Sequence, residues 1–201
     1  MTRSIKKIQE MYSNNEQIVA ITSYTAPMSF IADELCDIIL VGDSMEMVLY
    51  GNKDTTSLEL DCIIKHARTV SNYTKNAFVV CDVPFSYYEK SPESAFENIS
   101  KIIKNSGVDA VKIEGGIEFV PTIDFLTKRG ILVMGHIGLM PQRVRFHGSY
   151  KTVRDNESDF INKAKQLQDA GVFSIVLENI PPDLAKNTTK VLSIPTIGIG
   201  S

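Results

Sequence analysis

Short apolar runs rich in β-branched residues recur along this chain, separated by segments with helical periodicity. Three runs start from a glycine and are near-copies in register: GVDAVKIE from Gly107, GILVMGH from Gly130 and GVFSIVLE from Gly171. Because glycine takes the left-handed backbone conformation without a Cβ clash, each of these glycines is expected to end a helix just before a strand begins. The pattern therefore indicates a repeat of strand–helix units.

Seven runs have the length and composition of strands, and the clearest helices lie between them. The predicted strands are Ile18–Ser23, Asp37–Asp43, Ala77–Asp82, Ala110–Glu114, Ile131–His136, Ser174–Glu178 and Ile194–Ile199, and the clearest predicted helices are Leu58–Thr74, Pro92–Asn105 and Ser158–Ala170. Continuously apolar strands that alternate with helices indicate an α/β fold whose parallel sheet is covered by helices. Seven runs favour a (β/α) barrel over a doubly wound sheet, and since no linker-like stretch divides the chain we expect one domain over residues 1–201.

Helix starts can also be predicted locally. Thr56 and Glu59 have the spacing of a capping box before the first clear helix. Ser91 followed by Pro92 is a favourable N-cap and first-turn pair for the second helix.

Charge and cysteine content exclude several classes of protein. The net charge of −3 offers no general attraction to nucleic acid or to an acidic membrane surface. No run of about 18 apolar residues is present to span a membrane, and no apolar signal segment follows the basic start. Cys36, Cys62 and Cys81 are odd in number and lack a CxxC spacing, so neither a disulfide framework nor a zinc cluster is expected and a reducing cytoplasm fits.

Ionisable side chains stand at the carboxyl ends of five predicted strands: Asp43, Asp82, Glu114, His136 and Glu178. Alone, each has a structural interpretation, such as a turn cap for Asp43 or Asp82. In a barrel these strand ends converge on one face, where the active site is built. Five such groups at equivalent positions therefore predict a shared site.

Lys112 and Glu114 are two residues apart on one predicted strand, so both side chains point to the same face. If Val111 and Ile113 face the helices, Lys112 and Glu114 face the barrel interior. Burying these charges is costly unless they pair with each other or bind a ligand. A structural ion pair is the alternative to a functional role.

The acids predict a metal ion and a base. Asp43, Asp82 and Glu114 cannot all stay ionised near one axis without a cation, and a hard divalent ion such as Mg²⁺ suits their oxygen atoms. His136 is either a fourth ligand or a hydrogen-bond donor to substrate, and Lys112 beside a metal suits an anionic ligand such as a carboxylate. Glu178 follows an apolar run, a setting that favours a general base, unless it caps the helix entered at Pro181.

Other candidates carry weaker signals. Ser44 is either a donor to a bound carboxylate or a loop cap, and His66 is expected to be a packed residue inside a helix. The Gly198–Gly200 pair could approach a phosphate. A loop with Arg143, Arg145 and His147 is either an anion contact or a solvated loop.

These strand-end segments resemble the ketopantoate hydroxymethyltransferase family. The matching stretches are VGDSMEMVLYG at 41–51, CDVPFSYY at 81–88, VKIEGG at 111–116, GHIGLMPQ at 135–142, LENIPPDLA at 177–185 and IPTIGIG at 194–200. The resemblance implies a (β/α)₈ barrel of the TIM type and a homo-oligomer. It also implies transfer of a hydroxymethyl group from 5,10-methylenetetrahydrofolate to 3-methyl-2-oxobutanoate, a step of pantothenate and coenzyme A synthesis, through an enolate of the oxo acid.

By the same resemblance, Asp43, Asp82 and Glu114 would hold Mg²⁺ and Glu178 would accept the proton. The oxo acid would be bound by Ser44 and Lys112 along with the metal-binding aspartates and His136.

The chain also departs from the family pattern. Glu46 stands where a glycine is usual, Thr25 where an aspartate is usual, and Ser201 where a glycine-alanine run would continue. The eighth strand and closing helices are expected to be missing from this sequence. Two rival interpretations remain: a related metal-dependent oxo-acid lyase or mutase of the phosphoenolpyruvate mutase type, and a non-catalytic barrel serving as a binding or assembly subunit.

Overall fold

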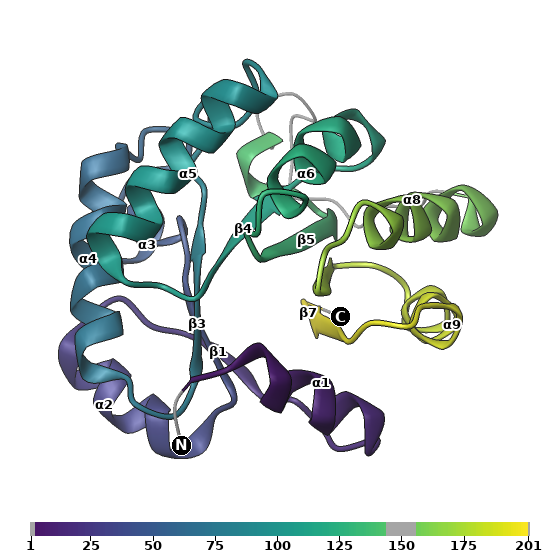
Figure 1. Ribbon diagram of the computed structural model, residues 1–201, viewed down its shortest axis with the longest axis horizontal. Coiled ribbons are helices and arrows are strands. Elements are labelled where there is room, and N and C mark those ends of the chain that lie inside the picture. The colour runs from purple at the N-terminus through teal and green to yellow at the C-terminus, as the bar shows by residue number, and fades with distance from the viewer. Residues whose placement is uncertain (1–2, 144–155, 201) are drawn as a thin grey trace. The chain divides into compact units, whose positions relative to one another are not determined.

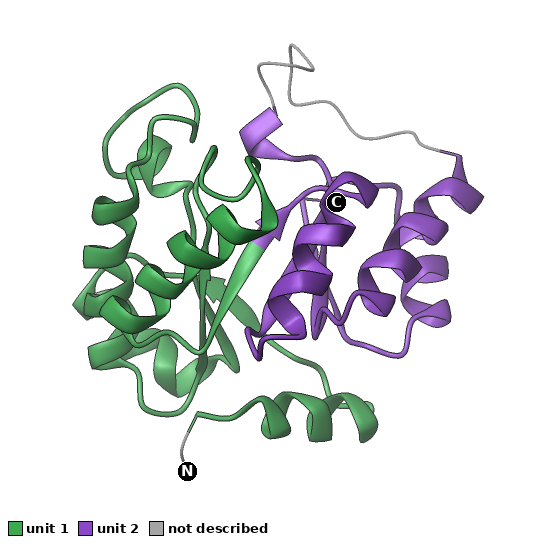
Figure 2. Cartoon of the chain, turned by 45° about the horizontal axis from the view of Figure 1, so that its top comes forward, with its two compact units in different colours: residues 1–112 green, residues 113–201 purple. Residues whose placement is uncertain are grey.

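The computed structural model describes residues 3–143 and 156–200. The chain divides into two compact units, Met1–Lys112 and Ile113–Ser201, which Figure 2 colours separately. The strands follow one another in the sheet in chain order, from β1 to β7. Every strand pair with a recorded register is parallel.

The first unit contains four strands, of which the last continues into the second unit. Its elements are α1 (Ile5–Ser13), β1 (Ala20–Thr22), α2 (Ala26–Leu35), β2 (Ile38–Val41), α3 (Met45–Val48), α4 (Leu60–Tyr73), β3 (Phe78–Asp82), α5 (Pro92–Ser106) and β4 (Ala110–Glu114) (Figure 1). Helix α4 packs against β2, β3 and its neighbours α2 and α5. Because helices cover these strands, every residue of β3 and β4 is buried.

The second unit repeats the same alternation. Its elements are η1 (Ile117–Phe119), α6 (Val120–Thr127), β5 (Val133–Gly138), η2 (Pro141–Arg143), α8 (Glu157–Asp169), β6 (Ser174–Glu178), α9 (Pro182–Val191) and β7 (Thr196–Ile199). Helices α8 and α9 lie side by side, as Figure 1 shows, and α6 packs on β5. Strand β5 is buried along its whole length and runs two residues beyond the predicted end at His136.

Helix α5 begins and ends as the sequence predicts. The Ser91 side chain accepts a hydrogen bond from the backbone N–H of Ser94 at 3.2 Å, and Pro92 occupies the first turn. Gly107 ends the helix in the left-handed conformation, with φ of 72°. Positive φ angles at Gly130 and Gly171 confirm the same expectation for the other two repeats.

The capping box predicted at Thr56 is wrong. Helix α4 is capped by Glu59, whose side chain makes no capping bond. The backbone N–H and hydroxyl of Thr56 instead donate to Asp54, at 3.0 and 2.6 Å. The aspartate two residues earlier forms a local turn with Thr56, so the threonine cannot cap the helix.

All seven predicted strands are present, and their parallel order with intervening helices is that of a (β/α) barrel. No eighth strand lies within residues 3–143 and 156–200. No helix in this part of the chain is both long and apolar enough to cross a membrane.

Candidate functional site

Asp43, Asp82 and Lys112 form a buried cluster at the carboxyl ends of strands in the first unit, here called the aspartate–lysine cluster. Parallel register places Asp82 opposite Lys112 on adjacent strands β3 and β4. Lys112 Nζ lies 3.0 Å from Asp82 Oδ1, and the backbone N–H of Asp43 donates to Asp82 Oδ2 at 2.9 Å. All three residues are at most 4% exposed. Two carboxylates and one ammonium held this way can bind a cation and an anion together.

Ser44 and Tyr24 adjoin this cluster. Ser44 begins α3 just after β2, and its Oγ lies 2.8 Å from the Oη of Tyr24, which follows β1. Burial raises the pKa of the Tyr24 phenol, the Ser44 hydrogen bond opposes this, and the charges of Asp82 and Asp43 raise it further. The phenol is therefore protonated at neutral pH. Sequence reasoning missed Tyr24, although its place after a predicted strand is the signal that identified the acids.

Glu114, His136 and Glu178 form a second cluster inside the second unit, here called the glutamate–histidine cluster. His136 Nδ1 lies 3.5 Å from Glu114 Oε1, and its Nε2 lies 3.1 Å from Glu178 Oε2. His136 and Glu114 are almost fully buried, whereas the Glu178 side chain is 23% exposed. A histidine between two carboxylates can orient both of them and can transfer a proton from one carboxylate to the other.

Gln142 is a second residue that sequence reasoning missed. It is buried in η2, and its backbone N–H donates to Glu114 Oε2 at 3.1 Å. Glu114 is thus fixed by Gln142 on one oxygen and faces His136 with the other. A backbone donor leaves no trace in residue type, so no sequence signal could have identified it.

The backbone around Glu178 is fixed by close approach of neighbouring strands. The Glu178 carbonyl accepts a hydrogen bond from Leu139 N–H at 2.8 Å, and Asn179 N–H donates to the Ile199 carbonyl at 2.9 Å. Gly138 has φ of 103°, and a Cβ there would collide with the Glu178 carbonyl oxygen. Glycine at position 138 therefore allows the approach that holds the backbone of Glu178.

The aspartate–lysine cluster offers the donors that Mg²⁺ prefers. Mg²⁺ usually binds one or two carboxylates and keeps its other positions for water and substrate oxygens. Asp43 and Asp82 supply such a pair within one unit. Among the residues that the structure describes, no group of three or more His, Cys, Asp or Glu side chains is arranged to hold a metal ion. Glu114 as a third ligand accordingly stays a prediction.

The weaker candidates have local partners or lie outside the described part of the chain. The buried Glu46 carboxylate accepts hydrogen bonds from Asn52 and from the Ser57 hydroxyl, so it holds the loop after α3. Arg143 pairs with Glu118 at 2.7 Å. Arg145 and His147 lie outside the described residues. A Cβ at Gly198 would meet nothing within 4 Å, so crowding does not explain that glycine.

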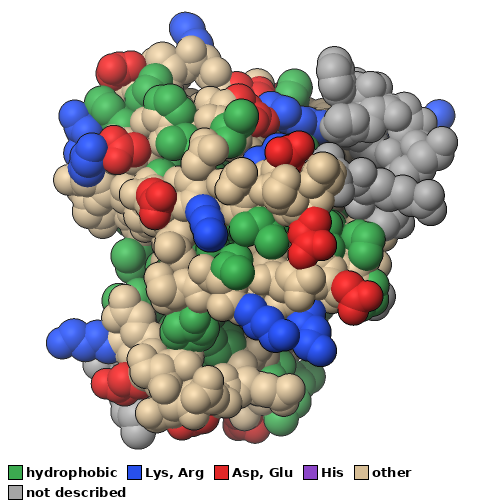
Figure 3. Space-filling view, turned by 90° about the vertical axis from the view of Figure 1, so that its right-hand side faces the viewer, with side chains coloured by type: hydrophobic (Ala, Val, Ile, Leu, Met, Phe, Trp, Pro, Cys, Tyr) green, Lys and Arg blue, Asp and Glu red, His purple; other side chains and the backbone are tan. Residues whose placement is uncertain are grey.

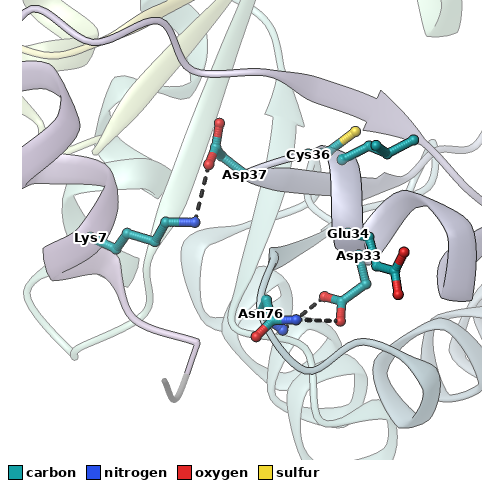
Figure 4. A pocket seen from close by; sticks show the side chains of 7 residues that line it. Lys7, Asp33, Glu34, Cys36, Asp37 and Asn76 are labelled. Carbon is teal, nitrogen blue, oxygen red and sulfur yellow. Dashed lines mark hydrogen bonds and ion pairs between the residues drawn. The ribbon is translucent and has the colours of Figure 1, made fainter.

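A cavity of about 380 Å³ lies at the opposite, amino-terminal end of β2 and β3. Figure 4 shows Asp37 bonded to Lys7 and Asp33 bonded to Asn76 at its wall. Asp33 also accepts hydrogen bonds from the backbone N–H groups of Lys75, Asn76 and Ala77. These carboxylates are already used to hold the starts of strands.

Figure 3 shows basic and acidic side chains interspersed on one face of the molecule, with small groups of hydrophobic side chains between them. This mixture agrees with the small net charge and shows no large basic surface on that face.

The fold is shared with solved enzymes. A phosphonopyruvate hydrolase in complex with oxalate and Mg²⁺ matches with a TM-score of 0.74 at 12% identity, over 99% of this chain and 72% of that one. A 2,3-dimethylmalate lyase of the PEP mutase/isocitrate lyase superfamily matches with a TM-score of 0.71 at 16% identity, over 98% of this chain and 72% of that one. The chain is therefore a (β/α)-barrel protein with acidic and basic side chains at its carboxyl strand ends.

Sequence comparison identifies the family within this class. The family model for ketopantoate hydroxymethyltransferase matches residues 2–201. The 3-methyl-2-oxobutanoate hydroxymethyltransferase of Bartonella quintana is 49% identical over 189 residues, which is 92% of this chain and 69% of that protein. That of Rhizobium etli is 47% identical over 187 residues, or 92% and 68%. The chain belongs to the ketopantoate hydroxymethyltransferase family, a family of enzymes.

Proposed function

We propose that this chain transfers a hydroxymethyl group from 5,10-methylenetetrahydrofolate to 3-methyl-2-oxobutanoate, giving 2-dehydropantoate for pantothenate and coenzyme A synthesis. The observation that carries the proposal is the family match over residues 2–201, with relatives of that name at up to 49% identity. The buried aspartate–lysine cluster supports it, since an oxo acid needs a cation at its oxygens and a positive charge near its carboxylate.

Substrate binding is assigned to the first unit. Asp43 and Asp82 would hold Mg²⁺, which when bound draws electron density from the keto group and so makes the neighbouring C–H bond more acidic. Lys112 would then attract the substrate carboxylate, and Ser44 would donate a hydrogen bond to it. A buried ammonium is a strong partner for a carboxylate because little water competes for either charge.

Proton removal is assigned to Glu178. Its partly exposed carboxylate lies 3.1 Å from His136 Nε2. His136 beside Oε2 would orient the group and leave Oε1 to take the proton from the carbon beside the keto group. That carbon then bonds to the methylene carbon of the folate, both of whose C–N bonds break: one is replaced by the new C–C bond and the other by the hydroxyl of a water molecule. The proton lost by the oxo acid and the remaining proton of the water pass to the two folate nitrogens, and tetrahydrofolate leaves.

A turnover assay with the oxo acid, methylenetetrahydrofolate and Mg²⁺ tests the proposal directly. Formation of 2-dehydropantoate is expected, and its absence at all Mg²⁺ concentrations would favour the non-catalytic interpretation. Glu178→Gln should abolish deuterium exchange at the C–H position of the oxo acid while leaving Mg²⁺-dependent binding intact. Unchanged exchange would remove Glu178 from the role of base.

Location and assembly are further parts of the proposal. Cys36, Cys62 and Cys81 are all free thiols, which agrees with a reducing cytoplasm. A homo-oligomer is proposed on the family resemblance, and light scattering in solution measures it.

Similarity to lyases and hydrolases at 12 and 16% identity concerns the fold, so it gives no support to a lyase reaction here.

A further inference from the structure

Two segments next to the aspartate–lysine cluster, one after β1 and one after β2, are connected through His66. Tyr24 follows β1 and Ser44 follows β2, and their hydroxyl groups are 2.8 Å apart. His66, on α4, lies 2.7 Å from the Tyr24 backbone oxygen through Nδ1 and 2.7 Å from the Tyr50 hydroxyl through Nε2. Tyr50 is six residues beyond Ser44, on the other side of the short helix α3. His66 therefore contacts the backbone of Tyr24 and, across α3, the segment that begins at Ser44.

The bonding partners define the tautomer of His66. A backbone carbonyl only accepts hydrogen bonds, so Nδ1 carries the proton and donates to Tyr24. With the proton on Nδ1, Nε2 is the acceptor for the Tyr50 hydroxyl. A hydrogen bond with Cys62 raises the pKa of Tyr50 to about 12, with burial and the charges of Cys62 and Glu46 acting in the same direction. Tyr50 thus stays a donor across the physiological range.

The Tyr24–Ser44 bond also has a preferred direction. Either hydroxyl of this pair could be the donor. When the phenol, the stronger donor, donates its hydrogen, Ser44 Oγ accepts. The single hydrogen of Ser44 is then free for another acceptor, and accepting one bond strengthens the bond that Ser44 donates. With Asp43 adjacent in sequence and Lys112 paired to Asp82, an anionic oxygen of the substrate is the acceptor that this arrangement suits.

We propose that Tyr24 is a positioning residue for oxo-acid recognition, orienting the Ser44 hydroxyl toward the substrate carboxylate, and that His66 holds Tyr24 in place. This inference rests on the proposed function, because it takes the oxo acid as the ligand. It adds two residues that act through Ser44, one from the segment after β1 and one from α4.

A double-mutant cycle tests the Tyr24–Ser44 step. Tyr24→Phe removes one hydroxyl and should raise the KM for 3-methyl-2-oxobutanoate by about five- to tenfold, the effect of one lost hydrogen bond, with little change in kcat. In a Ser44→Ala background the same change should raise KM by less than about twofold, because the partner is already absent. Tyr87→Phe, which removes the phenol bonded to Glu59 at 2.7 Å, is the matched control and should leave KM unchanged.

Two isosteric changes test the role of His66. His66→Asn keeps an N–H donor near the Nδ1 position, whereas His66→Gln places its amide near the Nε2 position. The asparagine variant, which keeps the bond to the Tyr24 carbonyl, should therefore keep a KM close to that of the unsubstituted protein. The glutamine variant, which loses this bond, should approach the KM of Tyr24→Phe, and equal KM values for the two variants would overturn the role of His66. Thermal unfolding of each variant separates loss of fold from loss of positioning.

The outcomes separate the inference from the proposed function. If the unsubstituted protein neither binds nor turns over the oxo acid, both fail. If it does so and Tyr24→Phe keeps the same KM, or if the Tyr24→Phe and Ser44→Ala effects are simply additive, the inference alone is overturned. A lower Tm for Tyr24→Phe with an unchanged KM would likewise assign Tyr24 to stability.

Discussion

The two ends of the strands in the first unit both carry buried or partly buried aspartates, but the aspartates are bonded differently. At the amino-terminal ends, Asp37 accepts the backbone N–H of Val19 at 3.0 Å, and Asp109 accepts that of Val79 at 2.8 Å. Asp33 accepts three backbone N–H groups. Each of these carboxylates holds the chain where a strand begins.

At the carboxyl ends, Asp82 accepts one backbone N–H and faces the ammonium group of Lys112. Asp37 and Asp109 also pair with cations, Lys7 and Arg3, but these pairs are partly exposed and each aspartate keeps a backbone N–H at the start of a strand. The Asp82–Lys112 pair is buried, and a lysine head can exchange one oxygen partner for another. We therefore propose that the same residue type serves stability at one end and ligand binding at the other, in line with the general division between the two faces of (β/α) barrels. The following substitutions test this division.

The largest effect is expected from Asp82→Asn. The amide keeps an oxygen for the Asp43 N–H but removes the negative charge, so Mg²⁺-dependent binding of the oxo acid and turnover should both fall by more than about a hundredfold, the upper range for groups that only support a ligand. Calorimetry and a turnover assay measure these. Retained affinity would argue against Asp82 as a ligand.

Asp82→Asn also leaves the buried Lys112 without its charge partner, which lowers stability. Adding Lys112→Met should raise Tm again while turnover stays lost. This double variant separates a loss of chemistry from a loss of fold.

Asp33→Ala should have the largest effect on stability. Removing a carboxylate that accepts three backbone N–H groups leaves those donors unsatisfied, and the free energy of unfolding should fall by about 2–4 kcal/mol. Turnover per folded molecule should not change, as measured below the Tm of the variant. Loss of turnover in the folded variant would contradict the division between the two ends.

Low pH should lower the stability of the fold, partly through protonation of Asp33. Burial acts to raise the pKa of this carboxyl, but the N–H donors of Ala77, Asn76 and Lys75 together outweigh it, so the pKa lies below its ordinary value of 3.8. The unfolded chain therefore takes up this proton first, and the stabilisation present above pH 3.8 is lost as pH falls through the folded-state pKa. Between about pH 5 and about pH 3, the free energy of unfolding measured with denaturant should fall more steeply for the unsubstituted protein than for Asp33→Asn. Equal slopes would refute this.

The smallest effect is expected from Glu46→Gln. The glutamine can still accept from Asn52 or Ser57, so turnover and apparent Mg²⁺ affinity should change by less than about threefold. A marked rise in the Mg²⁺ requirement would instead place the charge of Glu46 within reach of the metal site.

Strand positions could be predicted because a continuously apolar run leaves few alternatives, and β4 and β6 have the predicted bounds. The start of α4 could not be predicted, because Asp54 competes for the donor groups of Thr56. Asp82 and Lys112 were identifiable as candidates from their strand-end positions, but their pairing follows from the β3–β4 register. The Tyr24–Ser44 contact joins residues that are 20 positions apart and needs the loop conformations as well.

The glycine at position 138 has a consequence for how the proposed base works. Since backbone hydrogen bonds hold the chain on both sides of Glu178, its carboxylate can reach only as far as rotation of its own side chain allows. A base carried on a strand end in this way keeps its place whether neighbouring loops are open or closed. The substrate must therefore be bound with its C–H group within reach of Glu178. A larger side chain at position 138 would collide with the Glu178 carbonyl oxygen and displace the base, which would slow proton removal without changing the reaction.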